Sequence, residues 1–230
     1  MDGKRPDDRL YCNASCSKRF SWWSRRSSWQ VRPVTLSPLP SKVRATERPL
    51  FSRTAAGKIT RRSDGASGAF LMQTTAPNLY SASFDLNGFE TAFGYNGKSG
   101  WMRDSRDGLR TLTGAASRDF QAETVYRNSR WLNAKAERTK IASGGKATVD
   151  GKAANVVLLT TAKGAQVKLF FDAATNLLLR EEIPNGDAVK TFDYSDYRKV
   201  GNVLEAFSID SKTSDENYEI QLDEIKHTEP

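Results

Sequence analysis

The chain has 230 residues, enough for one domain of about 150 to 200 residues with a hydrophobic core. Its net charge of +8 belongs to its first part, because residues 1–62 contain 15 Lys or Arg and 4 Asp or Glu (+11), whereas residues 63–230 contain 20 and 23 (−3). The larger, nearly neutral part gives no electrostatic reason to expect nucleic acid as a partner, and no apolar run approaches the roughly 20 residues of a transmembrane helix.

Histidine and cysteine usage excludes further classes of site. His227 is the only histidine, so a Ser-His-Asp triad or a multi-histidine metal centre has too few residues to be built. The only cysteines, Cys12 and Cys16, have a spacing that matches no metal or redox motif well, which leaves a loose disulfide or free thiols. We therefore predict no cofactor, no metal and no catalytic residue.

Residues 1–56 are predicted to be a basic segment that is disordered or poorly ordered. They are rich in Arg, Ser, Pro and Trp and show neither a helical nor a strand period. Interleaved Trp and Arg are typical of single-stranded nucleic-acid binding. Nothing here resembles a folded RNA-binding module, so we favour a tail or a translated upstream stretch with no secretory signal.

From Gly57 onward the sequence changes to short alternating segments separated by turn residues, which predicts one antiparallel-sheet domain over residues 57–230. Asn-Gly pairs at 87–88 and 96–97 are strong hairpin signals, because both central residues of a type I′ turn need positive φ. The pattern predicts four consecutive strands, at 67–75, 79–86, 89–95 and 98–103.

Alternation assigns faces to the second and third of these strands. Side chains two residues apart share a face, and the two apolar faces are expected to meet. The members are Tyr80, Ala82, Phe84 and Leu86 in one strand, and Phe89, Thr91, Phe93 and Tyr95 in the next. Trp101 is expected to supply a large buried surface, either in the core or in a cavity wall.

Residues 114–135 lack strand alternation, contain good helix formers and have no proline. They are predicted to form a helix with Phe120, Val125 and Tyr126 turned inward.

The strand pattern resumes at Ala136, where turn signals divide the chain into about six further strands, giving about ten in all. Asp172 and Asn176 are expected to close the turn inside 167–183, a segment with bulky apolar groups on both faces. A sheet of this length curls into a barrel or half-barrel. The second face of 167–183 then either packs into a filled core under the helix or lines an apolar cavity.

Several stretches together resemble the LolA-like family of outer-membrane lipoprotein-sorting proteins. They begin with GYNGKSGWMRDSRDGLRTLTG and cover most of the chain after Gly57, at 94–114, 147–160, 169–182, 192–209 and 220–227. The resemblance implies a mainly β fold with α (α+β), in which a strongly curved antiparallel half-barrel carries a helix across its concave face. It also implies an apolar cavity that receives a lipid or a lipoprotein acyl chain without any chemistry.

The resemblance further implies a periplasmic protein of the cell envelope with inner- or outer-membrane protein partners, peripheral to the membrane at most; a genuine N-terminus without a signal would instead mean the cytoplasm. A monomer is expected. The residues predicted to line the cavity are the large apolar ones on the inward faces: Tyr80, Phe84, Phe89, Phe93, Trp101, Phe170, Leu178, Phe192 and Phe207.

Two alternatives accompany this interpretation. Acidic pairs at 181–182 and 193/196 resemble an acid and a base, but alternation places the members of each pair on opposite faces, so an enzyme is not predicted. The second alternative is an envelope scaffold or protein-interaction module of the same fold with a filled core.

Overall fold

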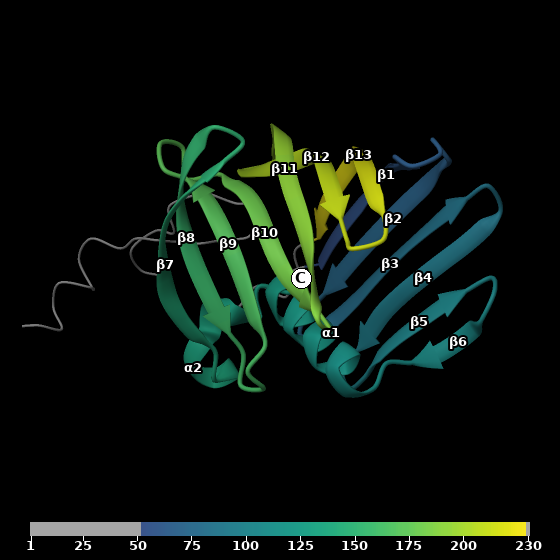
Figure 1. The fold of residues 1–230 in the computed structure, drawn as a ribbon, viewed down its shortest axis with the longest axis horizontal. Helices are drawn as coiled ribbons and strands as arrows, with labels where there is room; N and C mark the ends of the chain where they lie inside the picture. Colours follow the sequence, from purple (N-terminus) through teal and green to yellow (C-terminus); the bar gives the residue numbers. More distant parts are fainter. Residues whose placement is uncertain (1–51, 229–230) are drawn as a thin grey trace, which may run out of the picture. The chain divides into compact units, whose positions relative to one another are not determined.

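The structure, a computed structural model, describes residues 52–228. It contains one open antiparallel sheet that is curved like a half-barrel, together with a helical segment (Figure 1). The sheet has 13 strands and not about ten. They are β1 (Ser52–Arg61), β2 (Ser67–Thr75), β3 (Leu79–Leu86), β4 (Phe89–Asn96), β5 (Gly100–Asp104), β6 (Gly108–Thr111), β7 (Lys140–Val149), β8 (Lys152–Thr160), β9 (Gln166–Asp172), β10 (Leu178–Asn185), β11 (Ala188–Val200), β12 (Val203–Lys212) and β13 (Asn217–Thr228).

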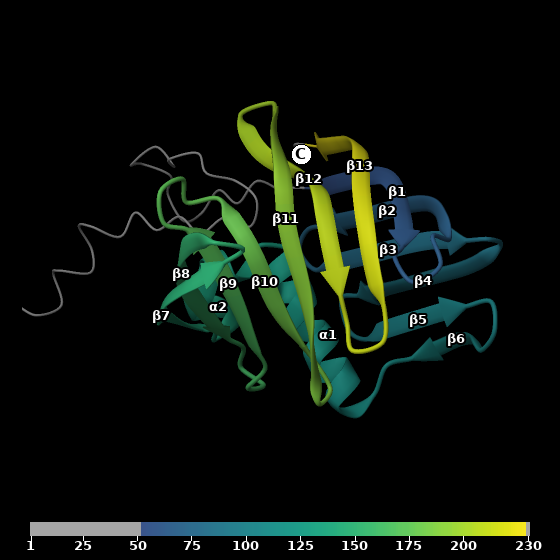
Figure 2. The ribbon, with the colours of Figure 1, turned by 45° about the horizontal axis from the view of Figure 1, so that its top comes forward.

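The strand order places the first strand in the middle of the sheet. Neighbours follow the order β6-β5-β4-β3-β2-β1-β13-β12-β11-β10-β9-β8-β7, so β1 pairs with β2 on one side and with β13 on the other. Figure 2 shows the two meanders, β1–β6 and β7–β13, meeting at this pair. The expected boundary at Gly57 falls inside β1, and Cys12, Cys16 and the rest of residues 1–51 lie outside the described residues.

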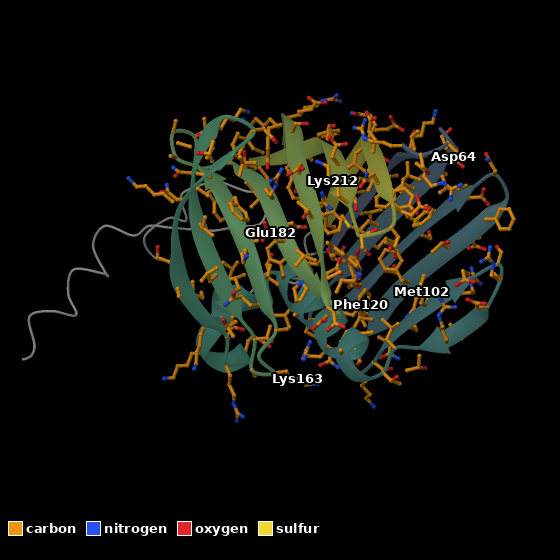
Figure 3. All side chains as sticks on the ribbon, in the orientation of Figure 1. Asp64, Met102, Phe120, Lys163, Glu182 and Lys212 are labelled. Atoms are coloured by element: carbon orange, nitrogen blue, oxygen red, sulfur yellow. The ribbon has the colours of Figure 1, made fainter. Side chains whose placement is uncertain are left out.

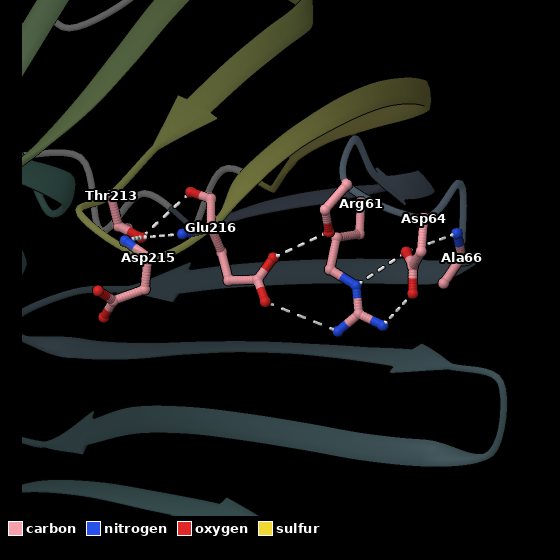
Figure 4. Close-up of polar contacts among 7 residues, drawn as sticks. Arg61, Asp64, Ala66, Thr213, Asp215 and Glu216 are labelled. Carbon is pink, nitrogen blue, oxygen red and sulfur yellow. Dashed lines mark hydrogen bonds and ion pairs between the residues drawn. The ribbon is translucent and has the colours of Figure 1, made fainter.

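Three strands were not predicted from the sequence: β1, β6 and β13. Of these, β6 and β13 each follow a turn that is closed by a side chain. Asp104 Oδ1 accepts hydrogen bonds from the backbone N–H of Arg106 (3.0 Å) and of Asp107 (2.6 Å) between β5 and β6. Thr213 Oγ1 accepts from Glu216 N–H at 3.0 Å between β12 and β13 (Figure 4). The β12–β13 turn contains no Asn-Gly or Asp-Gly pair, whereas the β5–β6 turn ends in Asp107-Gly108, with Gly108 at a φ of 68°, a hairpin signal that the sequence analysis did not use.

The same close-up shows how the β12–β13 turn is tied to the turn after β1. Arg61 donates two hydrogen bonds to Asp64, at 3.0 and 2.6 Å, and its guanidinium lies 3.9 Å from the Glu216 carboxylate (Figure 4). These groups are at the surface, so the ion pairs orient the two turns more than they stabilise them.

The helical segment is broken into three parts, whereas one helix was predicted over 114–135. Helix α1 (Gly114–Arg127) begins at the predicted residue, and a 3₁₀ turn η1 (Arg130–Asn133) and a single turn α2 (Ala134–Glu137) follow it. The break lies at Ser129, which adopts a left-handed φ of 55°. Phe120 and Tyr126 are buried and Val125 is half-buried against the core, as predicted.

The two sides of the sheet differ. We call the side against which α1 packs the helix side, and the opposite one the outer side; α1 contacts β3, β4 and β5 in one half and β9 and β10 in the other. The register pairs Tyr80 with Tyr95 and Ala82 with Phe93, so the predicted apolar faces of the two strands do meet on one side.

The segment 167–183 contributes to a core on each side. Its helix-side residues belong to the main cluster, which extends across β8–β13, β1 and α1: Val167, Leu169, Phe171, Leu178 and Ile183. Phe170 and Leu179 instead join a small cluster on the outer side with Val149, Ala154 and Val156. As predicted, Asp172 closes the intervening turn by accepting hydrogen bonds from the N–H groups of residues 174 and 175, both at 2.8 Å.

Candidate functional site

The first group of predicted ligand-lining residues lies under α1. Tyr80 and Phe93 are on the helix side of β3 and β4, and Phe120 reaches them from α1, with ring centroids 5.9 Å from Tyr80 and 6.1 Å from Phe93. Tyr80 is buried and Phe93 is half-buried. Figure 3 labels Phe120 on α1 and Met102 on β5. Burial raises the pKa of the Tyr80 hydroxyl far above its ordinary value, so this phenol stays neutral.

A row of apolar side chains crosses four strands at this level. The register places Met72 opposite Ala82, Ala82 opposite Phe93, and Phe93 opposite Met102, so all four point to the helix side. Met72, Phe93 and Met102 are all half-exposed, as is Phe84 one step along β3. We call Met72, Phe84, Phe93 and Met102 the apolar strip.

Sequence reasoning missed the two methionines of the strip because it selected aromatic residues. The sequence held the information, because Met102 follows Trp101 directly and successive side chains of a strand point to opposite sides of the sheet.

Phe89 lies on the helix side at the start of β4, paired with Leu86, and 64% of its surface is exposed.

Two predicted residues lie on the outer side, away from Phe93. Trp101 pairs with Gly94, and its ring covers that glycine so closely that a Cβ at position 94 would lie 2.6 Å from Cζ2. Phe170 pairs with Val156 in the outer cluster, and Leu178 pairs with Phe171 in the main core. A β-bulge between Leu178 and Arg180 shifts the register of the strand that follows.

The remaining predicted residues are in the main core. Leu178 and Phe207 are buried, with the Arg198 guanidinium 4.6 Å from the centre of the Phe207 ring. Phe192 is half-buried on β11, and the Arg127 guanidinium lies 4.9 Å from its ring centre. These three side chains therefore pack with the protein's own groups, apart from the strip.

A buried polar network fixes α1 to β10 and β11. Arg127, near the end of α1, forms an ion pair with Glu181, which is fully buried, and a second with Glu123 at 3.5 Å. The Tyr194 hydroxyl donates to Glu181 Oε1 at 2.6 Å and accepts from Arg127 Nη1 at 3.0 Å. Burial raises the pKa of Glu181, against the opposing effects of Arg127 and the neighbouring tyrosines.

A second anchor joins the start of α1 to the β10–β11 turn. Asp119 is 2% exposed, accepts a hydrogen bond from Gly186 N–H at 2.8 Å, and receives another from Arg118 Nε at 2.8 Å. Both ends of the helix are thus tied to the same hairpin.

Of the acidic pairs considered for catalysis, Glu181 and Glu182 are separated as alternation predicted, whereas Asp196 has a left-handed φ of 53° that interrupts the alternation after Asp193. Glu181 points to the helix side, whereas Glu182 lies on the outer side and pairs with Lys168 at 3.1 Å. Asp193 is held on the outer side by Arg180 and by Lys212 at 3.0 Å, and Asp196 pairs with Arg198. Each carboxylate has a cation partner that explains its position structurally.

The lone histidine takes part in a cluster on β1, β12 and β13. His227 Nε2 lies 2.7 Å from Glu205 Oε1, and Arg53 Nη2 lies 3.1 Å from Glu205 Oε2. Glu205 is 2% exposed, so the two partners compensate a buried carboxylate. Among residues 52–228, no three His, Cys, Asp or Glu gather in a way that could hold a metal ion, and no helix is long and apolar enough to cross a membrane.

Comparison with known proteins returned matches to solved structures. No protein-family model and no curated protein matches the chain. A DUF1329 family protein from Desulfovibrio piger has a TM-score of 0.51 and 15% identity, covering 78% of this chain and 86% of that one. A LolA superfamily protein from Nitrosomonas europaea (TM-score 0.49, 13% identity, 80% and 88% covered) and an outer membrane lipoprotein-sorting protein domain from Vibrio parahaemolyticus (0.48, 11%, 77% and 85%) are also similar.

At this level of identity the comparisons speak to the fold alone. The architecture that the sequence resemblance implied, a single open, curved antiparallel sheet with a short helical segment, is confirmed, and the DUF1329 family protein is similar to it in fold.

Proposed function

We propose that the protein binds an apolar ligand, a lipid or a lipoprotein acyl chain, on the helix side of β2–β5 beside α1, and that it serves lipid or lipoprotein trafficking in the cell envelope without catalysing a reaction. The observation that carries the proposal is the apolar strip. Met72, Phe84, Phe93 and Met102 are half-buried beside the core, so part of each apolar side chain stays in contact with water. A folded protein gains free energy by covering such surface, at about 25 cal/mol per Å².

The strip has a suitable form for an extended hydrocarbon chain. Its central row spans β2, β3, β4 and β5, which at about 4.8 Å between strands is roughly 14 Å from end to end. A chain lying along it would also contact Phe120 of α1, which is in contact with both Tyr80 and Phe93. Each methylene removed from water would contribute about 0.8 kcal/mol, before the cost of ordering the chain.

The proposal also gives helix α1 a role in the ligand site and the protein a location in the cell. Helix α1 would cover the concave side of the half-barrel and form one wall of the ligand site. A periplasmic location with inner- or outer-membrane protein partners fits a carrier, since the cargo has to be received and delivered. The resemblance of the sequence and the LolA-like fold support this assignment.

Titration with a fluorescent fatty acid tests the proposal. The wild-type protein should show saturable uptake with a blue-shifted emission. The double variant Phe89→Glu/Met102→Glu places two charges on the helix side and should weaken binding at least tenfold, because burying them beside an acyl chain is costly. Both side chains are exposed or half-exposed, so folding should survive.

A matched control uses the opposite side of the same half of the sheet, on β2 and β6. Leu71→Glu/Leu109→Glu introduces the same charges at residues that are 38% and 71% exposed on the outer side, and it should bind the probe like wild type. Equal affinity of all three proteins would contradict a helix-side site.

The envelope scaffold remains the second candidate, and one observation favours it. Leu178, Phe192 and Phe207, three of the residues expected to line a cavity, pack into the main core with the protein's own side chains. Failure of well-folded protein to take up any fatty acid would support the scaffold and remove the carrier.

A further inference from the structure

One corner of the sheet carries four exposed cations that no acidic side chain compensates. They are Lys135 of α2, Arg138 directly after it, Lys140 at the start of β7 and Lys163 in the turn between β8 and β9. Among residues 52–228, none of the four forms an ion pair, whereas every arginine within a strand does. Lys163 donates a hydrogen bond to the amide oxygen of Gln121 on α1, a neutral partner that leaves its charge uncompensated.

The register of β7 with β8 brings these cations together. Lys140 pairs with Thr160, the last residue of β8, so the start of β7 and the β8–β9 turn lie at the same end of the sheet. The link from α2 to β7 is short and folded back, because Thr139 N–H donates to the carbonyl oxygen of Ala134 at 2.9 Å. Figure 1 shows α2 at this end of β7, and Figure 3 shows Lys163 on the same lower margin of the molecule.

Two large aliphatic side chains of the same segment are also exposed. Leu132 of η1 is 53% exposed and Ile141 of β7 is 43% exposed. Ile141 pairs with Leu159, a residue of the main core, so it points to the helix side, where α1 continues into η1. We call the six exposed side chains the basic corner: Leu132, Lys135, Arg138, Lys140, Ile141 and Lys163.

The basic corner differs in charge from residues 63–230 as a whole. Residues 132–141 contain three cations and one acid, the half-buried Glu137, so their net charge is +2. Lys163 raises the charge of the corner to +3, whereas residues 63–230 together carry −3. An exposed patch that combines aliphatic groups with uncompensated positive charge marks an interaction site.

We propose that the basic corner is the surface through which the protein contacts an anionic phospholipid membrane. The ammonium and guanidinium groups bind lipid phosphates, and Leu132 and Ile141 enter the boundary between the head groups and the acyl chains. A nucleic acid would satisfy the cations but would leave both aliphatic side chains in water. A lipid surface presents phosphate and hydrocarbon side by side, so it is the partner that matches the whole corner.

The membrane contact is separate from the proposed ligand site and does not rest on it. The corner belongs to η1, α2, β7 and the β8–β9 turn, whereas the apolar strip lies on β2–β5. The helical segment joins the two regions, since α1 borders the strip through Phe120 and continues into η1. Loss of vesicle binding with intact fatty-acid uptake, or the reverse, therefore distinguishes the failure of one proposal from the failure of the other.

Co-sedimentation of the full chain with lipid vesicles tests the proposal. Wild-type protein should bind phosphatidylcholine vesicles that contain about one third phosphatidylglycerol about tenfold or more tightly than vesicles of phosphatidylcholine alone. Lys135→Glu/Lys140→Glu should weaken binding to the anionic vesicles about tenfold or more, because two attractive charges become repulsive. Both side chains are exposed, so circular dichroism and urea unfolding of this variant should match wild type.

Lys58→Glu/Lys199→Glu is the matched control, with the same change of charge at exposed lysines of β1 and β11, outside the corner. It should keep the vesicle affinity within about threefold of wild type, since charges more than about 10 Å from the lipid surface are largely screened at 0.1 M salt. The basic residues 1–51 are the same in all three proteins, so they cannot cause a difference between them.

Three outcomes of this comparison would overturn the proposal. Wild-type protein that does not bind the anionic vesicles has no such surface. Equal binding by wild type and Lys135→Glu/Lys140→Glu would place the contact elsewhere on the chain. Equal loss in both charge variants would reduce the effect to general electrostatic attraction.

A further variant separates a lipid surface from any other anionic partner. Leu132→Ser/Ile141→Ser should lower the affinity for anionic vesicles about tenfold or more, because two aliphatic groups no longer leave water, and it should bind a single-stranded oligonucleotide like wild type. Undiminished vesicle binding by this variant, with a wild-type unfolding curve, would refute insertion into lipid. Tighter binding of wild type to the oligonucleotide than to vesicles, abolished by Lys135→Glu/Lys140→Glu, would make the corner a nucleic-acid site instead.

Discussion

Gly100 decides how closely α1 can approach β5. A Cβ added at this position would lie 2.7 Å from Phe120 Cδ1 and 3.0 Å from Leu112 Cδ1. Gly100→Ala should therefore lower the free energy of unfolding by about 1 to 3 kcal/mol through overpacking, as measured by urea denaturation. In a Phe120→Leu background the cost should shrink, since the contacting ring is gone. An equal cost in both backgrounds would show that Phe120 is not the obstacle.

Asp193 makes part of the stability depend on pH. Burial raises the pKa of its carboxyl, but the hydrogen bonds and charges of Arg180 and Lys212 outweigh this and hold the pKa below its ordinary value. Because the unfolded chain binds the proton more readily, the stabilisation is present above about pH 3.9 and is lost as pH falls through the folded-state pKa.

Asp193→Asn should accordingly be less stable than wild type at pH 7, by on the order of 1 kcal/mol, and the difference should shrink at the acid end of a series of urea unfolding curves. Asp187→Asn, an exposed carboxylate in the adjacent turn, is the control and should change little at any pH. A difference for Asp193→Asn that stays constant from pH 7 to pH 3 would argue against the paired carboxylate.

Single residues also show where sequence reasoning reached its limit. The faces of Tyr80 and Phe93 followed from alternation, because β3 and β4 are regular and in register. Trp101 was grouped with them by its size, yet its position one residue before Met102 sends it to the outer side. Phe170 and Leu178 lie on opposite sides because the turn sets Leu178 against Phe171, the neighbour of Phe170, and the bulge after Leu178 then brings Leu179 to the side of Phe170.

At the scale of elements, α1 is held by buried charge more than by an apolar stripe. Its buried residues include Asp119, Glu123 and Thr124 beside Phe120 and Tyr126, and the ion pair of Arg127 with Glu181 lies between helix and sheet. This mixture explains why its periodicity was weak in the sequence and why the prediction rested on helix formers.

Arg127→Met should destabilise the protein by about 3 to 5 kcal/mol, because it leaves the buried carboxylate of Glu181 without its cation and leaves Glu123 with Lys190 alone, at 3.6 Å. Adding Glu181→Leu should recover part of the loss, and a double-mutant cycle from urea unfolding measures the coupling. Arg106→Met, at an exposed turn residue, is the control for loss of an arginine. Additive effects of the two core substitutions would contradict the pairing.

The elements that sequence analysis did not identify differ in the signal that their turns carry. Strands bounded by Asn-Gly and Asp-Gly pairs were placed to within a few residues, since positive φ restricts the residue types in those turns. The turn closed by Asp104 ends in Asp107-Gly108, a signal that was present in the sequence but was not used. The turn closed by Thr213 uses a side-chain acceptor that is common everywhere in a polar sequence. The helix end at Ser129 was invisible for the same reason, because no glycine or proline marks it.

For the whole molecule, β1 has a larger role than any other strand. It is the sole connection between the two meanders within the sheet, through its pairing with β2 and β13. A chain that lacks residues 1–51 should keep cooperative unfolding, whereas removal of residues 1–61 should abolish it, because β2 and β13 then lose their common neighbour. Circular dichroism and urea denaturation of the two truncated chains distinguish these outcomes. Cooperative unfolding of the shorter chain would mean that the meanders can pair directly.

The architecture was predictable from the sequence and the ligand was not. Regular hairpins and the family resemblance gave a curved antiparallel sheet with one helical segment. The exposure of the apolar strip, on which the proposed ligand binding rests, is set by the packing of α1 and by register across several strands. Such quantities arise from packing between distant segments, which local patterns do not encode.

The pairing of β1 with β13 links the earliest and the latest parts of the described chain during biosynthesis. Hairpins from β1 to β6 can form while the ribosome is still adding residues, but the free edge of β1 has no partner until β13 emerges, more than 150 residues later. During that interval the nascent protein exposes a strand edge beside an apolar face, and a chaperone or rapid release of the finished polypeptide would protect it from joining the wrong neighbour.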